Sequence, residues 1–350
     1  MAQAIEQDID IDAFLTDHGY LQLRVHCKTL KGSVLQGIKV AHDGTLQRVA
    51  IKQTAKTVPA ATANTTGNIA RHQAKALQVA HHAESEAHIL KYLTLQHEPV
   101  GNYLVRYIDF LQSDTHYYLV TEFVDATCDL RTFITRAHHY IARGLLSVKS
   151  YRSVVKFLFW QLAVSIAWLH DSMRCAHLNL CMENIMVSNV HFLVDAQGKV
   201  SIDDTIAIKI CGFSVVERFS IENADFRSQK AMCSLQYEAI CAPEIRSLAT
   251  ATAGYDARHI DIWCFGMLLF ECLSNQRLCP ATDAHQFSLI KYINCANLGK
   301  FFDRHSLSLL GRVLAVRATD RLNGVGILRH SWFRHYYVRY QARLNRRINV

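Results

Sequence analysis

The period of the hydrophobic residues changes along this chain, and that change limits the folds open to it. Residues 20–52 alternate apolar and polar side chains around turn signals at Gly32, Gly37 and Asp43-Gly44, which predicts an antiparallel strand meander. The segment AHDGTLQRVAIK contains a hairpin with Asp43-Gly44 at its turn and residues 48–52 in its second strand. The first part of the chain is therefore expected to be β-rich.

Helical spacing enters after residue 70 and dominates beyond Asp125. The predicted elements are a helix over 71–95, strands over 105–110 and 117–124, and a helix over 156–170. A strand-rich first third followed by a helical remainder predicts an α+β chain with two lobes.

The pattern divides the chain into four parts with one insert. We expect an N-terminal extension over 1–19, a β-rich lobe over 20–124 with a flexible insert at 53–70, a helical lobe over 125–335 and a basic tail over 336–350. The tail is basic and aromatic, so it is either a solvated terminal helix or one that docks on an acidic or calmodulin-type partner.

Composition excludes several classes of protein. The net charge of +8 over 350 residues is a mild bias, and we expect no nucleic-acid binding. Eleven cysteines without a C-x-x-C pair, and no secretory signal at the start, predict a cytoplasmic or nuclear protein with reduced thiols. The closest apolar run, 262–273, is shorter than the roughly 18 residues of a membrane span, so we expect a buried helix there and no span.

The run HLNLCMEN, from His177 to Asn184, carries the most specific signal. It resembles the catalytic loop H-R-D-L-x-x-x-N of eukaryotic protein kinases. Asn179 stands at the position of the catalytic aspartate, Cys181 at that of the loop lysine and Leu178 at that of the arginine. An amide cannot act as a base near neutral pH, and losing a positioned base typically costs about 10²–10⁴ in rate.

Further matches extend the resemblance into the β-rich part. In VAIK, Lys52 corresponds to the lysine that pairs with the nucleotide phosphates, and Glu86 to its partner on the C-helix. Counting back from Lys52 places Gly32 at the second glycine of the phosphate loop. Leu30 and Leu35 fall at the other two glycine positions, where side chains are expected to hinder phosphate binding.

The resemblance also implies an adenine site. YYLVTEFV resembles the strand and hinge over the adenine, with Thr121 as gatekeeper and backbone groups of Glu122 and Val124 facing the base. Ala50 and Met186 match positions that line the same site in the family.

The magnesium motif D-F-G is altered as well. The strand 206–210 leads to Gly212, Phe213 and Ser214 at the D, F and G positions, so Asn184 is the one metal-binding position retained. A second alignment uses GKVSIDD and puts Asp204 at the metal position. The first alignment requires an inserted hairpin near 190–205.

Structural positions of the family are retained in the C-terminal part. CAPE supplies Glu244, IDIWCFGMLLFE supplies Asp261 to brace the catalytic loop, and Arg321 is the expected ion-pair partner of Glu244. His177 and Phe213 also match scaffold positions, and HSWF resembles the ending of calmodulin-dependent Ser/Thr kinases.

The resemblance implies a two-lobe protein kinase fold whose losses fall on catalytic positions. We expect a pseudokinase that binds ATP weakly and without magnesium, and that works through a protein partner or a partner kinase. The alternative is a divergent, weakly active Ser/Thr kinase that transfers the ATP γ-phosphate with Asp204 or Glu183 as a substitute carboxylate. A nucleic-acid-binding module is a third class, resting on charge alone.

Overall fold

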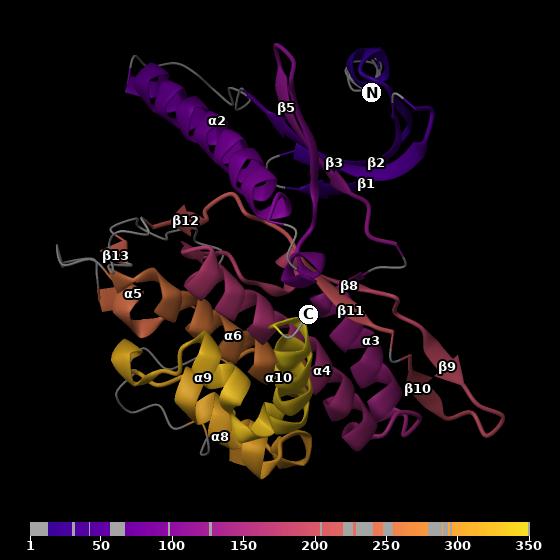
Figure 1. Ribbon diagram of the computed structural model, residues 1–350, viewed down its shortest axis with the longest axis vertical. Coiled ribbons are helices and arrows are strands. Elements are labelled where there is room, and N and C mark those ends of the chain that lie inside the picture. Colours follow the sequence, from indigo (N-terminus) through magenta and orange to yellow (C-terminus); the bar gives the residue numbers. More distant parts are fainter. Residues whose placement is uncertain are drawn as a thin grey trace. The chain divides into compact units, whose positions relative to one another are not determined.

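The chain folds into two compact units (Figure 1). The computed structural model describes residues 13–29, 32–41, 43–56, 67–96, 99–125, 128–203, 205–219, 227–228, 241–247, 255–278, 289, 293–294 and 296–348. The N-terminal unit comprises the chain up to Asp125 together with Phe213–Val215, and the C-terminal unit comprises the remainder.

The N-terminal unit is a five-stranded antiparallel sheet with one long helix. The strand order is β1-β2-β3-β5-β4. The elements are β1 (Tyr20–Thr29), β2 (Gly32–Val40), β3 (Leu46–Ala55), α2 (Gly67–Thr94), β4 (Tyr107–Gln112) and β5 (His116–Glu122). The predicted meander and the two later strands are confirmed, with boundaries shifted by a few residues.

The β2–β3 hairpin turns at Asp43-Gly44, as predicted. Gly44 has φ +80°, and the Asp43 carboxylate accepts a hydrogen bond of 3.0 Å from the Thr45 N–H. The turn predicted at Gly37 is wrong, because Gly37 lies inside β2 opposite Val49. A Cβ at Gly37 would come within 2.8 Å of the Leu23 side chain, so this glycine allows β1 to approach closely.

Residues 13–19, which belong to the predicted N-terminal extension, pack on one face of this sheet. Leu15 is fully buried against Val49, Ile51 and Val120, and the ring of Phe14 stacks on Tyr118 at 5.3 Å. The described part of the predicted extension, 13–19, is thus part of the core of the N-terminal unit. The earlier residues, 1–12, lie outside the described part.

The insert predicted over 53–70 is shorter than expected. Strand β3 continues to Ala55 and α2 already begins at Gly67. Residues 57–66, the remainder of the insert, lie outside the described residues. The prediction misplaced the end of β3 and the start of α2. The alanine and threonine residues in this part of the sequence favour neither a loop nor regular structure strongly.

The C-terminal unit is mainly helical (Figure 1). Its helices are α3 (Leu130–Ala142), α4 (Val148–Ala167), α5 (Pro243–Ser247), α6 (Ala257–Ser274), α8 (Arg304–Val313), α9 (Gly324–Arg329) and α10 (Arg334–Ile348). Its strands are β6 (Cys128–Asp129), β7 (Cys175–Ala176), β8 (Ile185–Ser188), β9 (Phe192–Val194), β10 (Val200–Ile202), β11 (Ala207–Ile210), β12 (Glu217–Arg218), β13 (Arg227–Ser228) and β14 (Tyr255–Asp256).

Two apolar helices form the centre of this unit. Helix α6 is buried over nearly its whole length, as predicted for 262–273. The stretch Val148–Ser172, which contains α4, is the one described helix long and apolar enough to cross a membrane, and 78% of its most apolar part is buried. It is therefore a core helix. In the sequence, the run at 262–273 is the closest candidate for a span. The stretch Val148–Ser172 was overlooked, because polar residues such as Lys156 interrupt the apolar run there although the helix as a whole is apolar.

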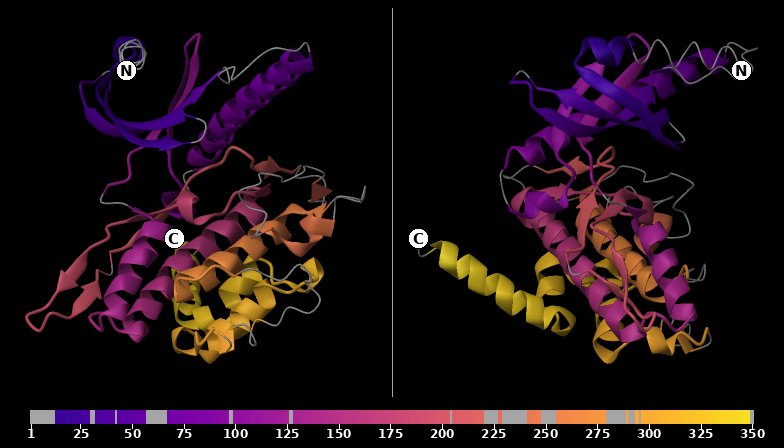
Figure 2. Two further views of the ribbon diagram at one scale, coloured as in Figure 1. Left: turned by 180° about the vertical axis from the view of Figure 1, so that it is seen from behind. Right: turned by 90° about the vertical axis from the view of Figure 1, so that its right-hand side faces the viewer.

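The inserted hairpin predicted near 190–205 is present as β9 and β10. Strand β11 then pairs with β8 in a small sheet of order β11-β8-β6. At the other end of the unit, α10 includes the predicted basic tail and begins two residues before it. Tyr336 and Tyr340 anchor α10 on Trp160, and Figure 2 shows the helix extending away from the other helices of the unit.

Candidate functional site

Lys52 and Glu86 form the ion pair that the resemblance implies. The Lys52 Nζ lies 2.7 Å from the Glu86 Oε2, and the side chains are 37% and 5% exposed. The other Glu86 oxygen accepts a hydrogen bond of 3.1 Å from the Phe213 N–H. Because Glu86 is buried and held at both oxygens, it fixes a partly exposed ammonium group that can meet an anion.

The residues predicted to surround adenine belong to both units. Ala50 on β3 lies opposite Thr121 on β5, so both are on the sheet face that carries Lys52. The Thr121 hydroxyl donates to the Glu122 carbonyl at 3.4 Å, and Val124 follows half-buried. Met186 lies on β8 of the C-terminal unit, paired with Lys209.

The register of β2 against β3 corrects the predicted phosphate loop. Val34, and not Leu35, pairs with Lys52 and shares its face. Leu35 pairs with Ile51 and is buried in the core on the opposite face, so its side chain does not hinder phosphate binding there. Leu30 lies outside the described residues.

Sequence reasoning missed Val34, although a signal existed. Gly32-Ser33-Val34 reproduces the G-x-V that ends the pattern G-x-G-x-x-G-x-V, which leaves Cys27 and Thr29 at the other two glycine positions. Gly32 is required for packing, because a Cβ there would lie 2.0 Å from the Gln53 carbonyl oxygen. Either alignment retains one glycine of three.

In the C-terminal unit, Asp261 holds the catalytic loop. Its carboxylate accepts hydrogen bonds from the N–H groups of His177 (2.7 Å) and Leu178 (2.8 Å), and it contacts His170 Nε2 at 2.8 Å. Leu178 has φ +60°, an unfavourable backbone for a branched residue. Because Asp261 is fully buried and lies on α6, the core helix fixes the strained loop.

Asn179, Asn184 and Gly212 bind one another. The Asn179 side-chain amide donates to the Gly212 carbonyl at 3.0 Å, and the Asn184 side-chain amide donates to the Asn179 carbonyl at 2.8 Å. The Cys211 N–H donates to the Asn184 carbonyl at 2.9 Å. Strand β11 thus brings Gly212 next to the loop, as the first alignment expects. Asp204, the alternative metal position, lies outside the described residues.

These residues do not fit a magnesium ion. Mg²⁺ is usually bound through carboxylates, and position 212 has no side chain. A Cβ built on Gly212 would lie 2.6 Å from the side-chain amide of Asn184, so that amide occupies the space beside position 212. Within the described residues, no three His, Cys, Asp or Glu side chains gather as a metal site.

The other two altered loop positions are buried. Leu178 and Cys181 are each 3% exposed. An apolar side chain and a thiol therefore replace the arginine and lysine of the family, and both pack inside the C-terminal unit. Neither can neutralise a phosphoryl group.

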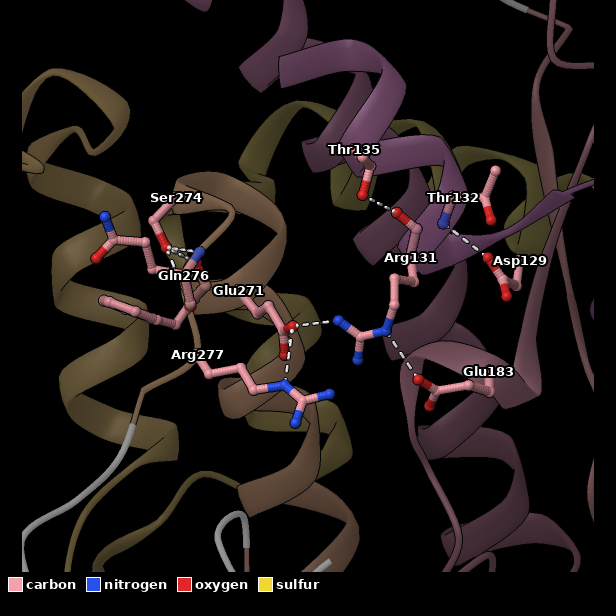
Figure 3. A network of polar contacts seen from close by, with 10 residues as sticks. Asp129, Arg131, Thr132, Thr135, Glu183, Glu271, Ser274, Gln276 and Arg277 are labelled. Atoms are coloured by element: carbon pink, nitrogen blue, oxygen red, sulfur yellow. Dashed lines mark hydrogen bonds and ion pairs between the residues drawn. The ribbon is translucent and has the colours of Figure 1, made fainter. Parts of the chain in front are cut away.

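Arg131 on α3 connects the catalytic loop to α6, a contact that the sequence did not indicate (Figure 3). Its guanidinium bonds to Glu183 at 2.8 Å and to Glu271 at 2.7 Å, and Arg277 approaches Glu271 at 3.7 Å. Partial burial opposes ionisation of Glu183, but the hydrogen bond from Arg131 outweighs it and keeps the pKa of Glu183 below its usual value. Glu183 is therefore engaged and weakly basic.

Glu244 and Arg321 form the predicted ion pair. Two parallel hydrogen bonds of 2.6 and 2.7 Å join the guanidinium to the carboxylate. Arg321 also donates to the His259 carbonyl and stacks over Trp263. This arrangement anchors the start of α5 to the segment before α9.

Comparison with known proteins agrees with this geometry. The family described as "Protein kinase domain" matches residues 31–333. This chain belongs to the protein kinase family. The kinase domain is 26% identical to CBL-interacting serine/threonine-protein kinase 17 of Arabidopsis thaliana over 236 residues, which cover 67% of this chain and 46% of the relative.

Two further relatives are similarly distant from this kinase domain. CBL-interacting protein kinase 21 of Oryza sativa subsp. japonica is 27% identical over 67% of this chain and 38% of its own length. Protein kinase kin1 of Schizosaccharomyces pombe is 24% identical over 67% of this chain and 22% of its own length. The chain thus matches less than half the length of these relatives.

Proposed function

We propose that this kinase domain is a pseudokinase that acts by binding proteins, with weak, magnesium-independent nucleotide binding. The observation that carries the proposal is the closed set of contacts among Asn179, Asn184 and Gly212. Amides and a glycine stand at the positions of the base and the magnesium carboxylate, and the two side-chain NH₂ groups donate to main-chain carbonyls of the same set. The names of two relatives describe them as CBL-interacting, which supports a protein partner.

A divergent, weakly active Ser/Thr kinase is the second candidate. The intact Lys52–Glu86 pair and its link to Phe213 favour it, because the pair would hold the α- and β-phosphates of ATP. Phosphoryl transfer depends mainly on positioning and charge, so a missing base alone does not abolish it. Glu183 is a poor substitute base because Arg131 engages it and its pKa is lowered.

Nucleotide binding is tested by thermal shift with ATP, in EDTA and in Mg²⁺. We expect a small stabilisation of equal size in both, which Lys52→Met abolishes because the phosphates lose their cation. Lys149→Met, at an exposed position on α4 of the C-terminal unit, is the control. Stabilisation that requires Mg²⁺ would contradict the proposal.

Catalysis is tested with radiolabelled ATP and a mixture of protein substrates. The proposal expects no transfer above that of a sample without the protein. Transfer that Lys52→Met abolishes would establish the active kinase instead and overturn the pseudokinase.

A further inference from the structure

The hairpin formed by β9 and β10 leaves one strand edge open. The strands pair in regular antiparallel register, with Val194 opposite Val200 and Phe192 opposite Ile202. Figures 1 and 2 show the hairpin projecting beyond the helices of the C-terminal unit. Its edges and exposed side chains are not used by the proposed pseudokinase site.

The hairpin is rigidly attached to the unit on one side. Its turn is closed by the Asp195 carboxylate, which accepts from the Lys199 N–H at 2.8 Å, and Gly198 has φ +76°. On β10 the Val200 N–H donates to the Leu145 carbonyl at 2.8 Å. At the base, the ring of Phe192 stacks on Phe133 of α3. The edge of β10 is thus docked on the unit.

The opposite edge, on β9, pairs with no strand among the described residues. The Asp195 N–H donates to the Lys199 carbonyl, and the His191 carbonyl accepts from the Asp203 N–H, so the main-chain groups of these two residues face the β10 side. In an antiparallel strand successive residues face opposite sides, so the N–H and C=O groups of Phe192 and Val194 point away from β10. Leu193 and Val194 are also 53% and 65% exposed. This edge is short, at three residues, but it carries no bulge, proline or lysine, so its outward N–H and C=O groups can pair with another strand.

One edge of the N-terminal sheet is irregular in contrast. Strand β1, at that edge, is interrupted by two register shifts and by Gln22 at φ +54°. Bulges of this kind disfavour pairing with a further strand. The β9 edge has no such irregularity.

The surface beside β9 is basic. Helix α3 contains no acidic residue, and its exposed positions include Arg136 and His139, with Arg143 directly after it. The Arg136 guanidinium lies 4.9 Å from the ring of Phe192, so this charge lies on the hairpin face that Phe192 shares with Val194. A segment that pairs with β9 would meet apolar side chains next to positive charge.

We propose that β9 binds an extended segment of a partner protein in which apolar residues alternate with acidic ones. The segment adds as a third strand and bonds to the backbone of Phe192 and Val194. Because side chains alternate along a strand, its apolar residues lie beside Leu193 on one face, and its acidic residues lie on the opposite face, which carries Phe192 and Arg136.

The test uses short fluorescein-labelled peptides and fluorescence polarisation with the full chain. One peptide alternates valine with glutamate, and the other alternates valine with lysine. We expect the glutamate peptide to bind, and the lysine peptide to bind at least about tenfold more weakly. Failure of the glutamate peptide to bind, or equal binding of both, would overturn the proposal.

Two variants locate the binding edge. Val194→Pro removes one outward N–H without touching a bond to β10, and we expect about tenfold weaker binding. Leu193→Glu places a charge on the contact and is expected to weaken binding at least as much. Leu46→Glu, at an exposed leucine of the N-terminal unit, is expected to leave binding unchanged. Unchanged binding in both hairpin variants refutes the proposal. Sedimentation that shows a dimer dissociated by Leu193→Glu would assign the edge to a second copy instead.

Discussion

Asn184 has two roles at the residue scale. Its side chain bonds to the Asn179 carbonyl, and it also fills the space beside Gly212. A side chain at position 212 would therefore disturb Asn184 and its bond to the loop, and we expect that a carboxylate introduced there alone does not create a metal site. The three residues behave as one unit.

We expect Gly212→Asp to destabilise the protein without creating magnesium dependence. The new Cβ would displace the Asn184 amide, and the backbone at φ +80° suits glycine better than aspartate. One lost hydrogen bond and this strain together cost about 1–3 kcal/mol. Urea unfolding measures the loss. Gly311→Asp, where a Cβ meets nothing within 4 Å, is the matched control. Magnesium-dependent phosphoryl transfer by Gly212→Asp would contradict the expectation.

At the residue scale, the sequence predicted which chemical groups stand at the site better than it predicted how β2 pairs with β3. The amide at Asn179 and the missing side chain at Gly212 are residue identities, and they can be read directly. Which face Leu35 occupies depends on where the β2–β3 hairpin turns, and a shift by one residue reverses every side chain. The contact of Asn184 with Gly212 needs three-dimensional packing and has no sequence signal.

At the scale of elements, helix α6 supports the catalytic loop through Asp261. The aspartate accepts two main-chain N–H groups inside a buried region, and Leu178 depends on this for its unfavourable backbone. The brace acts on main-chain N–H groups, so it does not depend on which side chain stands at position 179. It stabilises the fold of the C-terminal unit.

We expect Asp261→Ala to cost about 2–5 kcal/mol of unfolding free energy, because two buried N–H groups lose a charged acceptor. Chemical denaturation followed by circular dichroism measures this. Asp320→Ala is the comparison, since Asp320 is exposed and its ion pair with Arg317 is long at 3.8 Å. Equal effects of the two changes would show that the brace is not a stabilising element.

The N-terminal sheet carries a pH-sensitive contact between its strands. Asp109 on β4 accepts from Tyr20 of β1 at 2.8 Å and from Lys39 of β2 at 2.9 Å. Partial burial raises the pKa of Asp109, but the bonds from Lys39 and Tyr20 outweigh it and lower the pKa below 3.8. A carboxyl group whose pKa is lower in the folded state than in the unfolded state stabilises the fold. This stabilisation is fully present at pH values above the pKa of the unfolded state, and it is lost as the pH falls through the pKa of the folded state.

We therefore expect Asp109→Asn to be less stable than the parent at neutral pH. The difference should shrink as pH falls below about 4, because the parent carboxylate is then protonated. Urea unfolding between neutral and acidic pH measures both proteins. A difference that grows toward acid would have the wrong sign for this assignment.

The order of elements was predictable, whereas the helix before β1 was not. Residues 20–52 and α4 each bury one face against the core, and burial of one face makes the apolar residues recur at the period of a strand or a helix. The short helix over 13–17 buries Leu15 and Phe14 with too few residues to form a period. Its role depends on the distant strands that it covers.

At the scale of the whole molecule, the two units differ in what they retain. The N-terminal unit contains the Lys52–Glu86 pair, whereas in the C-terminal unit an amide, a thiol and a glycine stand at the positions that the proposed alignment assigns to the base, the loop lysine and the magnesium carboxylate. A nucleotide is therefore expected to be held mainly by the N-terminal unit.

Hydrogen exchange tests this division. We expect ATP to slow exchange of amides in β2 and β3 more than of those in 177–184, because Lys52 provides the phosphate contact. Lys52→Met should remove the difference. Stronger protection of the catalytic loop than of β2 and β3 would place the nucleotide contacts in the C-terminal unit instead.

The two amides at Asn179 and Asn184 have a consequence for how the loop responds to its surroundings. A carboxylate at either position would repel other anions and would change charge in acid, whereas an amide does neither. These two side chains are held by neutral groups, the main-chain carbonyls of Gly212 and Asn179. Their hydrogen bonds therefore do not change protonation in acid, so any response of the loop to pH has to come from the carboxylates that hold it elsewhere, Asp261 and Glu183.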